Sequence, residues 1–350
     1  MGKSIVGIDI AGTAIRAVEV ANADRARPTV LRFAEVPTPP DAVSRGEVLE
    51  PNTVAAALRS LWSTGRFRSR DVVLGMGNQR VLSRDLIVPA APLEQIRESL
   101  PFQVQDMLPV PVGDAILDFY PTSEGMSEDG PVVHGLLIAA IKDAVLANVH
   151  AAQLAGLNPV GVDLIPFALT RVLVGRPGLP GTTVLVQLGA DTTTVVLSTD
   201  GIPQFVRIIP IGGNDVTRAL AGNLDIEFAQ AEAVKRHLGI GQGARTPDDG
   251  RAVAIISDSV LELIASLRNT INYYVNTRPG ERVERIVLVG GGARLVGFRN
   301  ALGEHTRLPV EFRSAFAGAD VARSIPADDI AVHEDAIAVA YGLAVGSRAA

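Results

Sequence analysis

The chain has 350 residues, a formal net charge of −6 and no cysteine; 47% of its residues are apolar and only 4% aromatic. The length predicts about two domains, each with a core of aliphatic side chains, as in strands covered by helices. Charges of both signs are mixed and no Lys/Arg block occurs, which argues against nucleic acid as a partner, and the lack of cysteine excludes disulfides and thiol chemistry.

Neither export nor a membrane span is expected. Asp9 interrupts any apolar core that a secretion signal would need. The most apolar stretches, residues 135–141 and 336–346, fall short of the roughly 20 residues that span a bilayer. The tail, residues 346–350, has no amphipathic anchor for lipid. We therefore expect a cytoplasmic protein that reaches a membrane only through a partner.

Residues 5–20 predict a first hairpin, which consists of an apolar strand, a turn of small residues and a returning strand. The strand carries one acid, Asp9, and the turn contains Ala11, Gly12 and Thr13. A charged acid on an apolar strand is costly unless it has a partner. We therefore interpret Asp9 as a group that holds Mg²⁺ through water, rather than as an acid that caps the turn.

The next stretch predicts an α/β domain that is interrupted by an insert. Residues 29–36 predict a third strand and residues 52–64 a helix. Residues 71–157 then have the order strand, strand, helix, strand, strand, helix, which predicts a small inserted α+β domain with its own sheet. A strand and a helix within residues 159–174 return to the first domain. A linker rich in proline and glycine follows at residues 176–181.

Residues 183–217 repeat the plan of the first hairpin, at an offset of 178 residues that aligns Gln187 with Asp9 and Gly189 with Ala11. Two related halves would each contribute such a turn, and a nucleotide could then lie in the cleft between them. Alternatively, strand–turn–strand hairpins recur by chance in α/β proteins, so neither hairpin alone indicates a ligand.

One residue of the second hairpin differs from the residue that a metal-dependent phosphate site usually has. Gln187 stands where such a site usually has a carboxylate. Asp191 is either a displaced replacement for that acid or a turn residue, and we favour the turn residue. Gly189 lets the backbone approach a ligand, and Thr192 and Thr193 offer hydroxyls and backbone N–H groups.

Helices dominate the rest of the second half. Residues 217–238 are expected to be helical, and residues 251–275 predict a long amphipathic helix. The polar, glycine-rich residues 239–250 between them predict a loop. An alanine-rich helix at residues 331–345 is expected to pack back on the first domain.

A glycine triplet gives a third candidate ligand contact. Residues 285–289 predict a strand that runs into Gly290, Gly291 and Gly292, followed by a helix at residues 295–302. Glycines between a strand and a helix let the backbone lie flat against a ligand at the helix N-terminus, where phosphate is favoured. A single such turn is weak evidence, but this is the third turn of this kind.

The ordered set of features resembles the actin-like ATPase superfamily, and within it the PilM family, which is related to FtsA. The resemblance covers nearly the whole chain and rests on the following stretches. They are GIDIAGTAIRAVEV, AQLAGLNPVGVD, LVQLGADTTTVVLSTDGIPQFVRIIPIGGNDVT and IVLVGGGARLVGF, together with a Glu-x-x-Lys pair at Glu232 and Lys235. The combination is specific, although no single motif is.

The resemblance implies an α/β fold of two duplicated domains around a nucleotide cleft, with an inserted α+β subdomain of the FtsA/PilM kind. It divides the chain into a first actin-like domain (residues 1–70, 158–180 and 332–350), the insert (71–157), a second actin-like domain (181–216 and 284–331) and a helical subdomain (217–283).

The resemblance also implies ATP with Mg²⁺ in the cleft, with both hairpins on the phosphates, the Glu-x-x-Lys pair near ribose and adenine, and the glycine triplet beneath the base. The residues that match these motifs are Asp9, Ala11, Gly12, Thr13, Arg16, Gln187, Gly189, Asp191, Thr192, Thr193, Gly212, Gly213, Asp215, Glu232, Lys235, Gly290, Gly291, Gly292 and Arg294.

As a function, the resemblance implies a scaffold of a type IV pilus or related secretion platform at the inner face of the cytoplasmic membrane. Its partner would be the N-terminal cytoplasmic peptide of a PilN-like membrane protein, docked between the first domain and the insert. Pilus motor ATPases would be further partners. No motif marks the peptide contacts, and self-association stays open.

Two residues depart from the family pattern: Ala11 replaces a usual glycine, and Gln187 replaces a usual aspartate. A neutral amide supports Mg²⁺-bound water less well than an acid does, so we expect ATP binding with weak or no hydrolysis. Asp9 and Gln187 are the candidates for contact with the metal or its water. The alternatives are a small-molecule kinase on the same fold and an FtsA-like filament protein.

Overall fold

A computed structural model of the chain describes residues 4–241, 244–278 and 280–346. The first half is built on a six-stranded sheet with the strand order β10-β6-β1-β2-β3-β16. Strands β1, β2 and β3 form an antiparallel meander, and β6 and β10 continue the sheet in parallel with β1. In chain order the strands are β1 (Ser4–Ile10), β2 (Ala14–Ala21), β3 (Thr29–Pro37), β6 (Asp71–Met76), β10 (Asn158–Leu164) and β16 (Asp320–Val321).

The second half repeats this plan in a five-stranded sheet of order β13-β12-β11-β14-β15. Its hairpin β11–β12 pairs Gln187 with Thr194, and hairpin β1–β2 pairs Asp9 with Arg16, so the offset of 178 residues holds for both positions. The internal repeat expected from the sequence is thus a repeat of topology and register. The strands are β11 (Thr182–Leu188), β12 (Thr193–Thr199), β13 (Ile202–Ile209), β14 (Val283–Val289) and β15 (Val310–Phe312).

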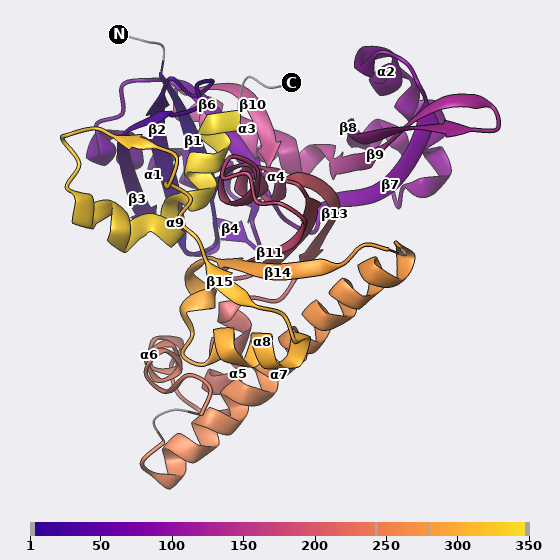
Figure 1. The fold of residues 1–350 in the computed structure, drawn as a ribbon. Helices are drawn as coiled ribbons and strands as arrows, with labels where there is room; N and C mark the ends of the chain where they lie inside the picture. The colour runs from indigo at the N-terminus through magenta and orange to yellow at the C-terminus, as the bar shows by residue number, and fades with distance from the viewer. Residues whose placement is uncertain (1–3, 242–243, 279, 347–350) are drawn as a thin grey trace.

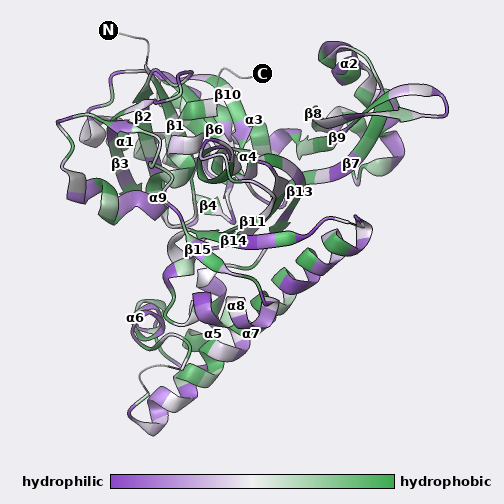
Figure 2. Ribbon diagram, in the orientation of Figure 1, coloured by the Kyte–Doolittle hydropathy of each residue, from purple (hydrophilic) through white to green (hydrophobic). Residues whose placement is uncertain are grey.

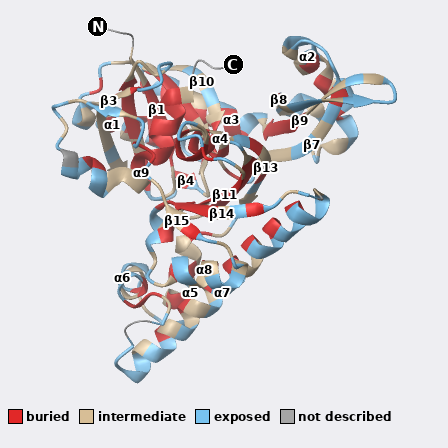
Figure 3. Cartoon of the chain, in the orientation of Figure 1, coloured by how far each residue is buried: buried red, intermediate tan, exposed pale blue. Residues whose placement is uncertain are grey.

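Two helices lie between the halves and join them. Helix α4 (Ile165–Thr170), which continues as a π-helical turn η3 (Arg171–Gly175), and helix α9 (Ala327–Gly346) share one buried cluster with Val73 of the first sheet and Leu185 of the second. Helix α9 packs so closely on β1 that a Cβ at Gly7 would lie 1.9 Å from Ala340 O. Helices α1 (Pro51–Gly65) and α3 (Lys142–Leu154) contribute to the core on the other face. Figure 3 shows that burial concentrates in the two sheets and α9.

The second sheet carries a helical layer on its outer face (Figure 1). Its helices are α5 (Gly213–Leu224), α6 (Phe228–Leu238), α7 (Pro247–Thr277) and α8 (Phe298–Thr306). The segment expected to be helical, residues 217–238, contains two helices, because Asp225 adopts a left-handed conformation (φ 52°) that ends α5. Helix α7 begins at Pro247, after a Thr246 cap and four residues before the predicted start at residue 251. Figure 2 shows apolar and polar residues alternating along α7, as its amphipathic sequence predicts.

The insert projects from the first half as a separate three-stranded sheet of order β7-β9-β8 with helix α2 on one face (Figure 1). Its elements are β7 (Val81–Pro89), α2 (Leu93–Gln103), β8 (Ala115–Ser127) and β9 (Gly130–Ile141). The strand predicted at the start of the insert is β6, and assigning it to the insert's own sheet is wrong, because it pairs with β1 and β10. Strand β8 continues to Ser127 opposite β9, so β8 and β9 form a long hairpin with a short turn.

A small hairpin, β4 (Val43–Ser44) and β5 (Glu47–Val48), lies between β3 and α1 and was not predicted. Within the residues that the structure describes, no helix combines the length and apolarity that a membrane span needs. The expectation about the tail concerns residues 346–350, of which 347–350 lie outside the described residues, as do residues 242–243 of the predicted loop.

Candidate functional site

Asp9 lies at the end of β1 with only 7% of its surface exposed. Burial raises the pKa of its carboxyl, and the positive charge of Arg16 partly offsets this rise. Arg16 is directly opposite on β2, and its Nη1 lies 4.0 Å from Asp9 Oδ2. Arg16 Nε also forms a 3.1 Å ion pair with Glu35. Asp9 is thus a buried acid whose recorded ion pair, with Arg16, is long, and a bound cation or water would favour its charged form.

Gln187 occupies the equivalent position on β11 and is partly buried. Its cross-strand neighbour Thr194 is 1% exposed, and no hydrogen-bond partner for Thr194 Oγ1 occurs among the described residues. Directly opposed residues of a sheet share a face. The second hairpin therefore presents an amide and an unsatisfied hydroxyl where the first presents an acid and a guanidinium, and a buried polar atom without a partner favours a bound water or ligand.

The turns of the two hairpins meet. A Cβ at Gly12 would lie 2.2 Å from Asp191 Oδ2, so only glycine leaves room for that carboxylate. Asn214 Nδ2 donates to Asp191 Oδ1 (2.9 Å), and Arg218 Nη2 lies 3.8 Å from the same oxygen. Asp191 therefore does more than shape its own turn: it places a negative charge between the two turns that were predicted to contact phosphates.

The start of α5 packs on the second turn. The backbone N–H of Gly213 donates to Gly189 O (3.0 Å), and the N–H of Asn214 donates to Ala190 O (2.7 Å). The Asp215 carboxylate accepts from the N–H of Gly212 (2.7 Å), and the N–H of Asp215 donates to Gly212 O (3.1 Å). These helix N-terminal donors are therefore used within the protein, which makes the first-turn amides of α5 a poorer phosphate site than the predicted motif suggested.

Thr193 was also predicted to contact the ligand, but its hydroxyl donates to Ile211 O (2.6 Å) and the residue is fully buried. Thr13 is exposed at the tip of the first turn, and Ala11 and Thr192 are partly exposed. The accessible residues of the two turns thus include Ala11, Gly12, Thr13 and Thr192, whereas Thr193 supports the second turn from inside.

Lys235 and Glu232 form a compact polar cluster under α5. Lys235 is 8% exposed, and its Nζ contacts Glu232 Oε2 (2.6 Å), Gly213 O (2.9 Å) and Thr217 Oγ1 (2.8 Å). A Cβ at Gly213 would lie 3.5 Å from Lys235 Nζ and 4.0 Å from the Cα of Gly292. The structure therefore brings together residues from three sequence motifs that the resemblance placed around ATP. Thr217 was not predicted, although it lies one helical turn after Gly213, and its hydroxyl donates to Gly213 O.

The pKa of Glu232 predicts a pH dependence. Burial alone would raise this pKa, but hydrogen bonds from Lys235, Thr217 and Arg236 outweigh burial and lower it from 4.5 to about 2. Because the folded protein holds the charged form, the contribution to stability is complete above about pH 4.5 and is lost as the pH falls towards 2. We expect the melting temperature to fall more steeply across this window in the wild type than in Glu232→Gln, as measured by calorimetry at several pH values. Equal slopes would show that the cluster contributes nothing.

The glycine triplet packs on the end of β11. Gly290 has φ 99°, and a Cβ there would lie 2.5 Å from Leu188 O. A Cβ at Gly292 would lie 2.6 Å from Leu188 Cγ, whereas one at Gly291 would meet open space. The triplet does not lead directly into an α-helix as predicted: residues Gly291–Arg294 form a 3-10 turn (η4), and α8 begins only at Phe298. The outer two glycines thus serve packing, and Gly291 is the one that faces free space.

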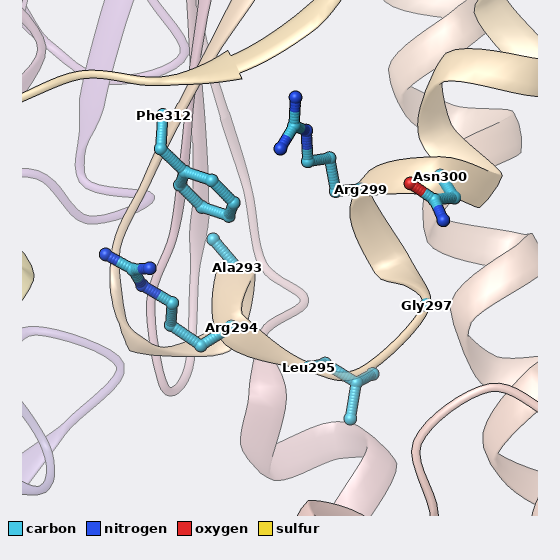
Figure 4. A pocket seen from close by; sticks show the side chains of 7 residues that line it. All are labelled: Ala293, Arg294, Leu295, Gly297, Arg299, Asn300 and Phe312. Carbon is cyan, nitrogen blue, oxygen red and sulfur yellow. The ribbon is translucent and has the colours of Figure 1, made fainter. Parts of the chain in front are cut away.

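Arg294 reaches out of this turn to the inter-domain helix. Its Nε donates to Asp335 Oδ2 of α9 (2.5 Å), and its guanidinium lies 4.5 Å from the centre of the Phe312 ring. Arg294 and Phe312 border a cavity of about 260 Å³, and Figure 4 shows its lining side chains. The cavity is lined by Ala293, Arg294, Leu295, Gly297, Arg299, Asn300 and Phe312. Ala293, Arg294, Leu295 and Gly297 belong to the stretch IVLVGGGARLVGF that carries the resemblance. Arg299, Asn300 and Phe312 were not predicted, because they are ordinary helix and strand residues in the sequence.

Comparison with solved structures agrees with the duplicated fold. A PilM–PilN type IV pilus biogenesis complex contains a chain that superimposes with a TM-score of 0.86 and 28% identity, over 98% of both chains. MreB5 of Spiroplasma citri bound to AMPPNP superimposes with a TM-score of 0.57 and 11% identity, over 100% of this chain and 97% of that one, which is a likeness of fold alone. The fold is therefore the actin-like one that the motifs predicted.

Sequence relatives agree with this result. The cell division protein FtsA of Bacillus subtilis (strain 168) is 26% identical over 107 residues, which are 31% of this chain. The match spans 24% of that protein, so this chain corresponds to only about a quarter of it. The model of the type IV pilus assembly protein PilM matches residues 7–348, and the chain therefore belongs to the PilM family.

Proposed function

We propose that this chain is the ATP-binding scaffold of a type IV pilus or related secretion platform, at the inner face of the cytoplasmic membrane. It would hold the N-terminal cytoplasmic peptide of a PilN-like membrane protein and couple it to motor ATPases. The observation that carries this proposal is the likeness to the chain in the PilM–PilN complex, which extends over 98% of both chains at 28% identity. Likeness over both halves and the insert supports a shared partner better than a likeness of one domain would.

Several features of the cleft fit a nucleotide. Phosphates would contact the turns of Gly12 and Gly189, and Mg²⁺ chemistry would be supplied through water held by Asp9. Adenosine would lie near the Lys235 cluster and the open position at Gly291. No group of three acidic or histidine side chains suited to a metal occurs in the described part of the chain, so Mg²⁺ would depend mainly on phosphates and water. We propose weak or absent hydrolysis, because Gln187 offers no charge to that water.

The division into four parts stays a proposal, with one adjustment from the sheet topology. Because β6 belongs to the first sheet and α3 packs on its core, we propose that the insert comprises residues 77–141, and that residues 71–76 and 142–157 belong to the first domain.

For the peptide we propose the free edge of the first sheet beside the insert. Strand β10 pairs only with β6 in the described structure, and it exposes Val160 (50%) and Val162 (38%). An extended peptide that added a strand there would satisfy the free main-chain groups of β10 and cover both valines. This would place the peptide at the first domain, next to the insert, as the family resemblance implies.

Calorimetric titration of a PilN-like N-terminal peptide tests the scaffold role. Val160→Asp is expected to weaken binding about fivefold, because a charge replaces roughly 1 kcal/mol of buried apolar contact. The matched control is Leu261→Asp on α7, which is 41% exposed and lies in the other half. If neither ATP-bound nor ATP-free protein binds the peptide, the scaffold proposal fails. If both variants bind like the wild type, the peptide lies elsewhere.

A further inference from the structure

The hairpin β4–β5 has an unusual turn. Strand pairs Val43↔Val48 and Ser44↔Glu47 leave Arg45 and Gly46 as a two-residue loop, and both have positive φ (48° and 78°). This is the geometry of a turn that favours Asn-Gly, because a side chain at the first left-handed position costs backbone energy. An arginine at this strained position needs an explanation, and strained residues of this kind often serve a function.

The hairpin is held firmly to the first half. Val43 and Val48 belong to its buried core. Asn78, which is 2% exposed, donates from Nδ2 to Gly46 O (3.0 Å), and Arg80 Nε forms a 3.0 Å ion pair with Glu47. These contacts position the tip of the hairpin, and with it the backbone of Arg45, on the first half.

The Arg45 side chain reaches the second half. Its Nη1 donates to Pro210 O, and its Nη2 lies 3.5 Å from Asp215 Oδ1. The same Asp215 oxygen accepts from Arg218 Nη2 (2.9 Å), and Arg218 leads to Asp191, whose carboxylate rests on Gly12. A chain of contacts thus runs from the first half across the cleft and back to the first hairpin. Figure 1 shows β4 between the two sheets.

We propose that hairpin β4–β5 is a clasp that closes the nucleotide cleft, and that Arg45 is its closing contact. This rests on the proposed function, because a clasp of this kind controls how long a nucleotide stays. The contact is suited to a reversible gate: Arg45 is 41% exposed, so its ion pair is weak and can open. Release of Arg45 would free Pro210 and Asp215, on either side of the Gly212–Gly213 turn, to move away with the second half.

Arg45→Asn provides a sharp test, because asparagine suits the left-handed turn and is too short to cross the cleft. The matched control is Arg59→Asn, which removes an exposed arginine that bonds to Leu154 O within the first half. Since the chain has no cysteine, spin labels can be placed at Ser60→Cys on α1 and Ala254→Cys on α7, both of which are exposed. Pulsed electron paramagnetic resonance then measures the distance between the two spin labels, and so between the two halves, in the nucleotide-free protein.

We expect Arg45→Asn to shift the distance distribution to longer values, to leave the melting temperature equal or higher, and to speed dissociation of a fluorescent ATP analogue about fivefold. Arg59→Asn should change neither the distance nor the rate. An unchanged distance distribution in Arg45→Asn overturns the clasp, whether or not nucleotide binds. If no ATP analogue binds to the wild type, the nucleotide part of the proposed function fails, while the distance measurement still decides on the clasp.

Discussion

Gln187→Asp is expected to raise the rate of ATP hydrolysis by roughly 100-fold, the scale on which a positioned acid or base acts. The new carboxylate would stand opposite Thr194, whose buried hydroxyl has no partner among residues 4–241, 244–278 and 280–346. That hydroxyl could donate to the carboxylate and orient it. Asp9 stands at the equivalent position of the first hairpin, so the variant would restore an acid in each half. Phosphate release under single-turnover conditions measures the effect.

Two controls make this result interpretable. Gln187→Asn shortens the side chain without adding charge and should hydrolyse ATP no faster than the wild type. Asp9→Asn in the Gln187→Asp background should remove the gain, because the metal would lose its other acid. A wild-type rate that is already substantial and does not change in Gln187→Asp would contradict the view that the missing acid limits hydrolysis.

Asp191→Ser is expected to tighten ATP binding about tenfold, or ~1.4 kcal/mol. In the present structure the Asp191 carboxylate lies against Gly12, between the two turns proposed to contact phosphates. Like charges at this range repel, and Asp191 is only 14% exposed, so water screens the repulsion poorly. Serine keeps a hydroxyl for Asn214 and removes the charge. Titration with a fluorescent ATP analogue, with Asp258→Ser on the exposed face of α7 as control, measures the difference.

The same variant separates the two interpretations of Asp191. If Asp191 supplies the acid that Gln187 lacks, Asp191→Ser should weaken ATP binding in the presence of Mg²⁺ and have little effect without it. If Asp191 repels phosphate, binding should tighten in both conditions, and less so at high salt. Weaker binding with Mg²⁺ would therefore contradict our reading of the cleft and assign the metal to Asp191.

Local patterns determined much of this protein from the sequence. The apolar strands around Asp9 and Gln187, with a turn of small residues after each, predicted two equivalent hairpins, and the register Asp9↔Arg16 and Gln187↔Thr194 confirms the repeat. Such patterns are readable because strand and turn preferences act between neighbouring residues. The motif resemblance then predicted the family to which the chain belongs.

Only the tertiary structure decided which strands pair and which side chains meet across the cleft. Strand β6 reads like part of the insert, yet it pairs with β1 because parallel neighbours are chosen by long-range packing that periodicity does not encode. Asp191 resembles any turn residue until Gly12 is brought against it. Arg45 carries no motif, and its contact with Asp215 exists because two halves far apart in the chain fold against α4 and α9. Burial and charge at these positions depend on neighbours from the other half, which the sequence around each residue does not contain.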